Sequence, residues 1–423
     1  MNSYSQSAIR KDLRYRKIPF LISTMLFLTP LGFYVGDWQI NIVDSVVNDR
    51  SYSHNTTVPL LPLVLFLVYL LRMRIKGGVA LEDILLISTY MWLCIAYSVS
   101  YIGGKSPSTL ALIDNLTYVL PYLIGRSINW NTFLYLRHAL LYSVVLCVAV
   151  LYVLTLFKSG GLSERIYSVY RSVNEYRNYI PVVLYSVVFI LLSGMVGSLS
   201  KKQKLVCTVS LALFVVVSWS RTGILFGTLL LLFGFKKYFG VRVHGVLFAL
   251  FVLIVAIVFL FQSGLYLVFA DTVIGSRLIA TGEVLDGDVR RLRYMQEGIE
   301  RLFSSPLFGD AYVASLYYSP QGELYSEPRM FTPHNQLLEI GVRAGLVPMI
   351  LFVWLMVIFA TRMFKYSGPV GLIGLLAFCS LLSGFGQNVL TNYSGYFLWF
   401  IFGVGVSTRP RIKKNQRSRK VVL

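Results

Sequence analysis

The segment from Ala344 to Thr361 reads AGLVPMILFVWLMVIFAT, which is eighteen residues without a charged side chain. Arg362 and Lys365 follow it at once. An uncharged run of this length suffices for a helix to cross the roughly 30 Å hydrocarbon core of a bilayer. The segment therefore predicts a membrane helix whose basic end faces the cytoplasm.

Comparable apolar runs recur along the whole chain of 423 residues, of which 56% are hydrophobic and only 14% are charged. Soluble domains carry about 25% charged residues, so the composition excludes a soluble enzyme and a disordered chain. The four cysteines lie in apolar runs and show no metal or redox spacing. We predict an all-α polytopic membrane protein with about twelve helices. The candidate spans are 18–36, 58–72, 79–102, 107–125, 139–157, 180–199, 205–219, 222–236, 244–269, 337–362, 369–386 and 394–407.

The net charge of +20 follows the predicted topology. Basic residues come after every even-numbered span, as the positive-inside rule expects of cytoplasmic ends, so nucleic-acid binding is not expected. Both termini are then cytoplasmic and the largest outer segment lies between spans nine and ten. The predicted organisation is a basic N-terminus (1–17), nine spans (18–269), an extracytoplasmic loop (270–336), three spans (337–407) and a basic tail (408–423).

The first of three outward-facing motifs is Ser218-Trp219-Ser220-Arg221-Thr222-Gly223, between two apolar spans. An arginine at an outer boundary runs against the positive-inside bias. Two interpretations remain open from position alone. Arg221 either anchors the helix at the membrane interface or binds an anionic group.

The second motif begins with Arg290-Arg291-Leu292-Arg293 in the outer loop. Apolar residues follow at helical spacing until Pro306, which predicts an amphipathic helix with arginines in its first turns. Cations there oppose the helix dipole, so Asp286 and Asp288 or an anionic ligand must compensate. A locally paired surface cluster is the alternative. Asp286-Gly287-Asp288 also matches the Asp-x-Asp pattern of metal-dependent sugar transferases, but acids flanking a glycine are common in turns, and we predict no metal site.

The third motif begins with Thr332-Pro333-His334-Asn335. Thr332 is a good helix N-cap and Pro333 suits the first helical position, which would place His334 in the first turn of span ten at the outer face. The positive helix end disfavours the imidazolium form, and a neutral histidine can act as a general base. A capping or interface histidine is the alternative. Glu339 lies four residues before Arg343, at the spacing of a helical ion pair.

These motifs together resemble the bacterial O-antigen ligase and O-antigen polymerase superfamily over residues 205–365, roughly. The resemblance rests on Ser-Arg-Thr-Gly before a helix, on Arg291 ahead of Pro-Leu-Phe-Gly, and on His-Asn opening a helix after the outer loop. The family's His-Asn segment usually continues to Gly-x-x-Gly. Here Pro348 takes the place of the second glycine and is expected to kink the helix. Gly341 and Gly345 can supply the close packing instead.

The resemblance implies a GT-C-like membrane fold and a metal-independent, inverting glycosyltransferase without a cofactor. Its donor would be a glycan on undecaprenyl diphosphate, and its acceptor lipid A-core or a growing glycan. His334 carries over as the catalytic residue and Arg221 and Arg291 as diphosphate-binding residues. Arg290 and Arg293 could substitute for Arg291, and Asn335 and Glu339 would have supporting roles. The implied location is the bacterial inner membrane with the site facing the periplasm, among membrane lipids and other polysaccharide-assembly proteins.

Three classes of function remain open from the sequence, and the first, a glycan transferase, has two versions. The same residues serve a ligase and a polymerase, and the helix count with one dominant outer loop favours a ligase slightly. A polysaccharide transporter or flippase is the rival from another class, because twelve spans are common there. Transporters place ionisable residues near the midplane, and Asp114 is the main candidate here. A non-catalytic scaffold of a polysaccharide-assembly complex is the third.

Overall fold

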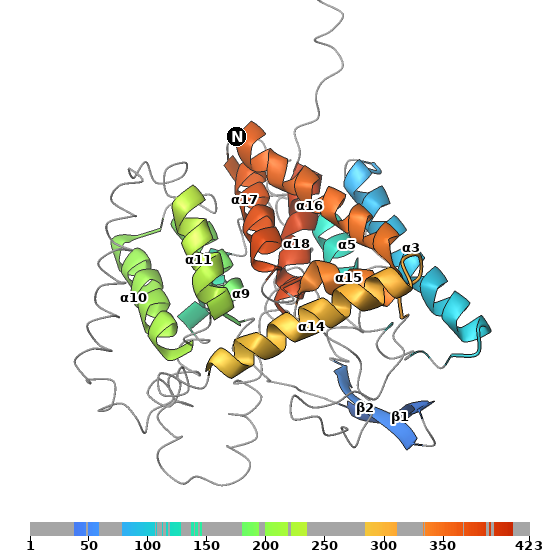
Figure 1. Ribbon diagram of the computed structural model, residues 1–423. Coiled ribbons are helices and arrows are strands. Elements are labelled where there is room, and N and C mark those ends of the chain that lie inside the picture. Colours follow the sequence, from blue (N-terminus) through green and yellow to red (C-terminus); the bar gives the residue numbers. More distant parts are fainter. Residues whose placement is uncertain are drawn as a thin grey trace, which may run out of the picture.

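Part of the chain is described by a computed structural model, shown in Figure 1. The described residues are 38–47, 50–58, 78–105, 107, 112, 116, 119–127, 137–138, 140–142, 144–145, 180–193, 199–218, 221–234, 284–310, 333, 335–366, 368–385, 389–390 and 393–408. The predicted spans 18–36 and 244–269 lie outside these residues, as do 59–72 of the second span, most of 139–157 and Asp114.

Helices dominate the described part of the chain. They are α3 (Leu81–Ile102), α5 (Val119–Ser127), α9 (Ile180–Leu192), α10 (Lys201–Ser218), α11 (Arg221–Gly234), α14 (Val284–Ser304), α15 (Gln336–Ala344), α16 (Leu346–Lys365), α17 (Gly368–Ser383) and α18 (Tyr393–Thr408). Helices thus occur where the sequence predicts spans three, six, seven, eight, eleven and twelve.

A β-hairpin departs from the predicted all-α fold. Strands β1 (Trp38–Val47) and β2 (Arg50–Val58) pair antiparallel, with an irregularity between Val43 and Ser45. Asn48 and Asp49 separate the two strands in the sequence, and both residue types favour tight hairpin turns. The predicted spans 18–36 and 58–72 leave this stretch as a connection between two helices, without a strand.

The start of α10 corrects another boundary. The basic run 201–204, which the predicted spans leave as a loop after span six, forms the first turn of α10. A capping box stabilises that start, because the Gln203 N–H donates to Ser200 Oγ at 3.2 Å and the Ser200 N–H donates to Gln203 Oε1 at 3.0 Å.

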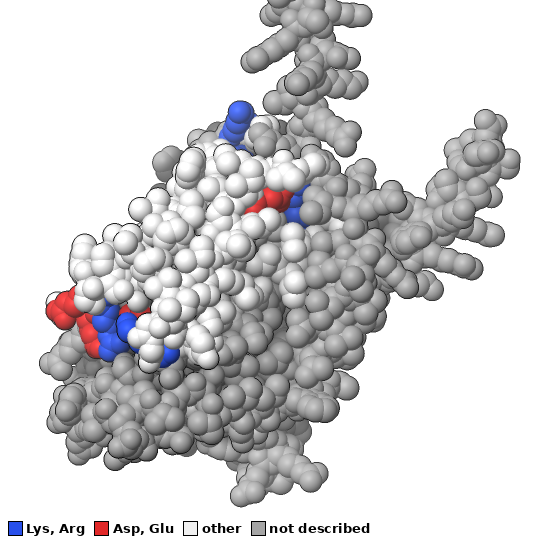
Figure 2. Space-filling view, turned by 90° about the vertical axis from the view of Figure 1, so that its right-hand side faces the viewer, with Lys and Arg blue, Asp and Glu red and all other residues white. Residues whose placement is uncertain are grey.

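Helix α3 is long and apolar enough to cross a membrane. Its 22 residues extend about 33 Å. Large apolar side chains stay exposed at helical spacing along its outer face, including Ile84, Ile87, Met91 and Ile95. In Figure 2 the described residues on this side form an uncharged surface, with charged atoms gathered toward its upper and lower parts. Shorter apolar helices lie at Val182–Leu192, Leu346–Arg362, Val370–Ser383 and Phe397–Thr408.

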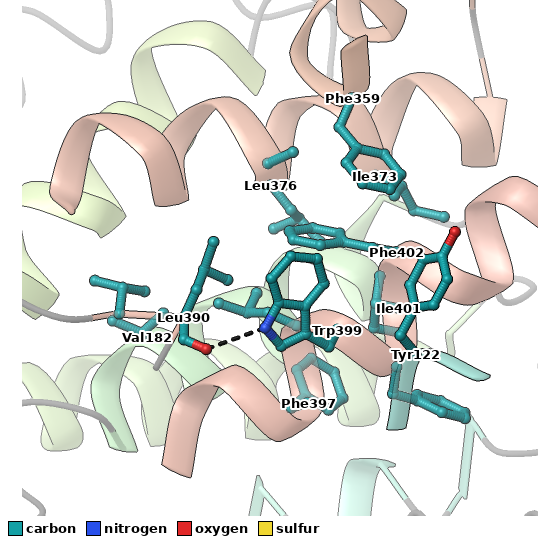
Figure 3. Packing of buried hydrophobic residues seen from close by; sticks show 14 of the residues in the cluster. Tyr122, Val182, Phe359, Ile373, Leu376, Leu390, Phe397, Trp399, Ile401 and Phe402 are labelled. Carbon is teal, nitrogen blue, oxygen red and sulfur yellow. Dashed lines mark hydrogen bonds between the residues drawn. The ribbon is translucent and has the colours of Figure 1, made fainter. Parts of the chain in front are cut away.

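Trp399 of α18 lies at the centre of the core (Figure 3). Its indole N–H donates to Leu390 O at 3.0 Å, so the buried polar atom is satisfied. The rings of Tyr122, Phe352 and Phe402 meet it edge-on. Residues from α5, α16 and α18 therefore share one aromatic cluster.

Two glycines bring α5 and α18 into backbone contact. A Cβ atom at Gly125 would lie 2.1 Å from Phe400 O, and one at Gly403 would lie 2.1 Å from Tyr122 O. Only glycine permits this approach at either position, which is the way small residues pack helices in membranes.

Buried charges join several helix ends. Asp83 at the start of α3 accepts from Arg126 Nε at 2.7 Å and Nη2 at 2.9 Å, and from the Tyr122 hydroxyl at 2.6 Å. Glu82 pairs with Arg362 near the end of α16. The start of α3 and the ends of α5 and α16 therefore lie together, and the sequence analysis places these three ends on one side of the membrane.

Candidate functional site

The amphipathic helix predicted in the outer loop is present as α14, and it packs on α15. A Cβ atom at Gly298 would lie 2.8 Å from Leu338 Cδ2 and 3.2 Å from Pro333 Cβ. One turn on, Leu302 Cδ1 lies 3.2 Å from where a Cβ of Gly341 would stand. The small residues at 298 and 341 thus allow both helices to approach closely.

The arginines of α14 occupy different faces of that helix. Residues at spacings of four, three and four form one stripe: Arg291, Met295, Gly298 and Leu302. The last two of these are buried against α15. Arg293 shares its face with Gln296 and Glu300, which are exposed, and Arg290 lies beside the stripe. Among the three arginines, position 291 is therefore on the face that contacts α15, about 10 Å along the axis from Gly298.

The acidic residues ahead of these arginines lie inside the helix. Because α14 begins at Val284, Asp286 and Asp288 occupy its first turn and the residue after it, rather than a turn before it. Their charge is favourable at a helix N-terminus, as the sequence analysis required of a compensating group. No group of three metal-binding side chains occurs among the described residues.

The start of α15 corrects the predicted cap. Asn335, not Thr332, is the N-cap, because its Oδ1 accepts from the N–H groups of Leu337 and Leu338 at 3.1 Å each. The helix begins at Gln336, so residue 334 precedes the cap instead of lying in the first turn. Asparagine competes well with threonine as a cap, and the sequence offered both. His334 itself lies outside the described residues, whereas its neighbours Pro333 and Asn335 lie within them.

Asn335 and Gln336 also hold the connection between α17 and α18. Asn335 Nδ2 donates to Phe385 O at 3.1 Å, and the Gln336 N–H donates to Gly384 O at 2.9 Å. Gln336 Oε1 accepts from the N–H groups of Val389 and Leu390 at 3.0 and 2.8 Å. Gln336 could not be predicted from the sequence, because nothing in the residues around it indicates that it binds this connection.

Span ten is two helices rather than one. Gly345 separates α15 from α16 with a φ of 91° and a ψ of −176°, a backbone conformation that is essentially restricted to glycine. A Cβ atom there would lie 2.2 Å from Leu307 O. Pro348 is the third residue of α16, where no backbone N–H is needed, so the predicted kink is replaced by a break three residues earlier.

The predicted ion pair of Glu339 with Arg343 is present within α15. Glu339 is only 4% exposed, and its Oε2 has no hydrogen-bond partner among the described residues. Removing either partner would leave a charge buried without its counterion. The pair is therefore buried in α15, the helix that follows His334 in the sequence.

A charged cluster lies where α14 ends. Arg301 donates to Glu297 Oε1 at 2.7 Å and to Asp310 Oδ2 at 3.2 Å. Burial raises the pKa of the Asp310 carboxyl above its ordinary value, and the neighbouring Arg301 guanidinium opposes that rise. These groups are paired with one another and lie at the opposite end of α14 from Arg291.

Arg221 is the first residue of α11, as the sequence predicts for a helix start. Helices α9 and α11 run in the same direction, because Gly227 abuts Tyr185 and Gly234 abuts Phe189. Val182, near the start of α9, and Leu390, whose N–H donates to Gln336, both belong to the buried core (Figure 3).

Residues 206–353 match the sequence model of a family described as O-antigen ligase. This part of the chain is therefore similar to O-antigen ligases. That region is less than half of the chain, and it contains Arg221, Arg291 and His334 together with α14, α15 and the start of α16. It supports the O-antigen ligase and polymerase superfamily, which is a family of membrane glycosyltransferase-like enzymes. No curated protein matches the chain.

Proposed function

We propose that this protein is an O-antigen ligase of the bacterial inner membrane. In this proposal it moves a glycan en bloc from undecaprenyl diphosphate to a hydroxyl of lipid A-core on the periplasmic side. The family region supports a lipid-linked glycan donor and a sugar acceptor in general. The helix ends joined by Asp83 and Glu82 would then lie on the cytoplasmic side, and α14 and α15 on the periplasmic side.

The observation that carries the proposal is the packing of α14 on α15 at Gly298. This contact supports the proposal because position 291 is on the face of α14 that packs on α15, and α15 follows His334 in the sequence. Pro333 and Asn335 are the neighbours of His334 in the sequence. Gly298 approaches Pro333 closely. Position 291 lies about two helical turns from that contact, a separation comparable with the size of a diphosphate-linked sugar.

The proposed chemistry assigns one role to each group. His334 takes the proton of the acceptor hydroxyl, and that oxygen attacks the anomeric carbon of the donor glycan. The bond from this carbon to the diphosphate oxygen breaks with its electron pair, and undecaprenyl diphosphate leaves. Arg221 and Arg291 neutralise the charge on the departing diphosphate, for which permanently charged, bidentate guanidinium groups are suited. Attack opposite the leaving group inverts the anomeric carbon, and no step requires a metal.

The test is the glycan profile of a deletion strain complemented with wild type, His334→Ala, Arg291→Ala or Arg293→Ala at matched expression. We expect wild type and Arg293→Ala to restore polymer on lipid A-core. His334→Ala and Arg291→Ala should leave long polymer on undecaprenyl diphosphate and a bare core. Single repeat units on the core would instead indicate a polymerase. A normal profile in the deletion strain would contradict both transferase functions.

A further inference from the structure

Trp92, near the middle of α3, joins two segments that are far apart in the sequence. Its indole Nε1–H donates to Leu307 O at 3.1 Å and to Ala344 O at 3.2 Å. Its ring stacks on that of Phe308, with centroids 5.9 Å apart and planes 8° from parallel. One side chain therefore contacts both the turn that follows α14 and the last residue of α15.

The helix break explains why the Ala344 carbonyl is available to Trp92. Ala344 is the last residue of α15, and the break at Gly345 leaves its carbonyl without an intrahelical partner. In an apolar environment an unsatisfied carbonyl is costly, so an indole donor at this point has a clear benefit.

The turn and the helix break also contact each other directly. The Leu346 N–H donates to Pro306 O at 2.7 Å, and the Asp310 N–H donates to Val342 O at 2.7 Å. Gly309 has a positive φ of 59°, and a Cβ atom there would lie 2.1 Å from Val342 O. We call residues 306–310 with 342–346 the turn–break junction. Trp92 fastens this junction to α3.

The junction controls the geometry of the proposed site at a distance. Helix α14 carries Arg291 and enters the junction at its C-terminal end. Helix α15 follows His334 and enters the junction at its own C-terminal end. A fixed junction therefore fixes the angle and separation of the two helices, including the contact of Gly298 with Leu338 and Pro333.

We infer that Trp92 is a positioning residue for glycan transfer. Through its indole N–H it holds α14 and α15 at a fixed angle and separation. This inference rests on the proposed function and adds a residue outside the matched region 206–353 to the machinery. Trp92 does not contact substrate in this account. It determines how well the diphosphate-binding arginine and the histidine are aligned.

The test compares purified wild-type protein with two variants at position 92. Trp92→Phe keeps an aromatic ring and loses the N–H. Replacement of Trp92 by benzothienylalanine keeps the indole shape and loses only the N–H. The control is Trp354→Phe, because Trp354 lies on the exposed face of α16. Rates are measured with an undecaprenyl-diphosphate-linked glycan and lipid A-core, and each is normalised to the folded fraction by size exclusion.

We expect both position-92 variants to lower kcat by roughly ten- to a hundred-fold while the KM for the donor stays unchanged, since small misplacements of reacting groups have effects of this size. Trp354→Phe should match wild type. An unchanged kcat in the benzothienylalanine variant would overturn the inference, as would a loss of activity that simply follows the folded fraction. An inactive wild type would overturn the proposed function itself and this inference with it.

Discussion

Gly345→Ala should destabilise the protein more than Gly368→Ala, although both glycines have a positive φ. The new Cβ would stand 2.2 Å from Leu307 O, 2.4 Å from Leu307 C and 2.7 Å from Pro306 O, all of which are backbone atoms. The backbone conformation at position 345 costs a non-glycine residue on the order of 1–3 kcal/mol. Displacing the turn would also weaken the hydrogen bonds of Leu346 and Trp92, each contributing about 1 kcal/mol. We expect a total loss of about 3–5 kcal/mol.

Gly368→Ala is the matched control for this prediction. Gly368 also has a positive φ, of 75°, but a Cβ atom there meets nothing within 4 Å. The assay is reversible unfolding of purified protein in mixed detergent micelles, followed by near-UV circular dichroism. Gly368→Ala should lose only the backbone component, about 1 kcal/mol. Equal losses for the two variants would refute the close docking of the turn at Gly345.

Three further substitutions test other parts of the fold. Asp83→Asn should lower the free energy of unfolding by about 3–5 kcal/mol, because Arg126 is left buried without its counterion. Tyr122→Phe should lower it by only about 1 kcal/mol. Similar losses for the two variants in denaturant titrations would argue against a buried ion pair. Asn335→Asp keeps the oxygen that accepts the N-cap hydrogen bonds, whereas Asn335→Ala removes it. Only the alanine variant should therefore lose the stabilisation by the cap, about 1 kcal/mol. Faster amide exchange at Leu337 and Leu338 in that variant would report the loss. Gly403→Ala should loosen α5 from α18 and lower stability by about 1–3 kcal/mol, and an unaffected melting temperature would rule out the backbone contact.

Local patterns identified α14 before the structure did. The apolar residues of the outer loop recur at helical spacing and Pro306 follows them, and these two features place a helix and its end without any tertiary information. The helix ends at Ser304, as the pattern predicts. The Glu339–Arg343 pair was equally visible, because both residues lie within one turn of a helix and their spacing alone decides whether they meet.

Features that depend on distant contacts were not visible. The break at Gly345 exists because the Pro306–Asp310 turn packs on it, and no pattern within residues 337–362 shows that turn. Trp92 is one of several aromatic residues in an apolar span, and only its two carbonyl partners distinguish it. The N-cap was misplaced for a smaller reason, since Thr332 and Asn335 are both good caps and the choice depends on where the helix begins.

The sequence alone does not show which of the three arginines of α14 faces α15, whereas the packing of the helix does. Arg290, Arg291 and Arg293 are equivalent as charges. Once Gly298 and Leu302 are known to face α15, the helical period separates position 291 from position 293. Arg291 thereby becomes the preferred diphosphate-binding candidate, and Arg293 serves as its control.

The most direct test of the central claim is transfer by the purified protein in lipid nanodiscs. The reaction contains an undecaprenyl-diphosphate-linked glycan and lipid A-core, with EDTA present, and its product is measured by mass spectrometry. The account predicts glycan on lipid A-core with wild type and with Arg293→Ala, no product with His334→Ala, and strongly reduced product with Arg291→Ala. Equal product from wild type and His334→Ala would contradict it.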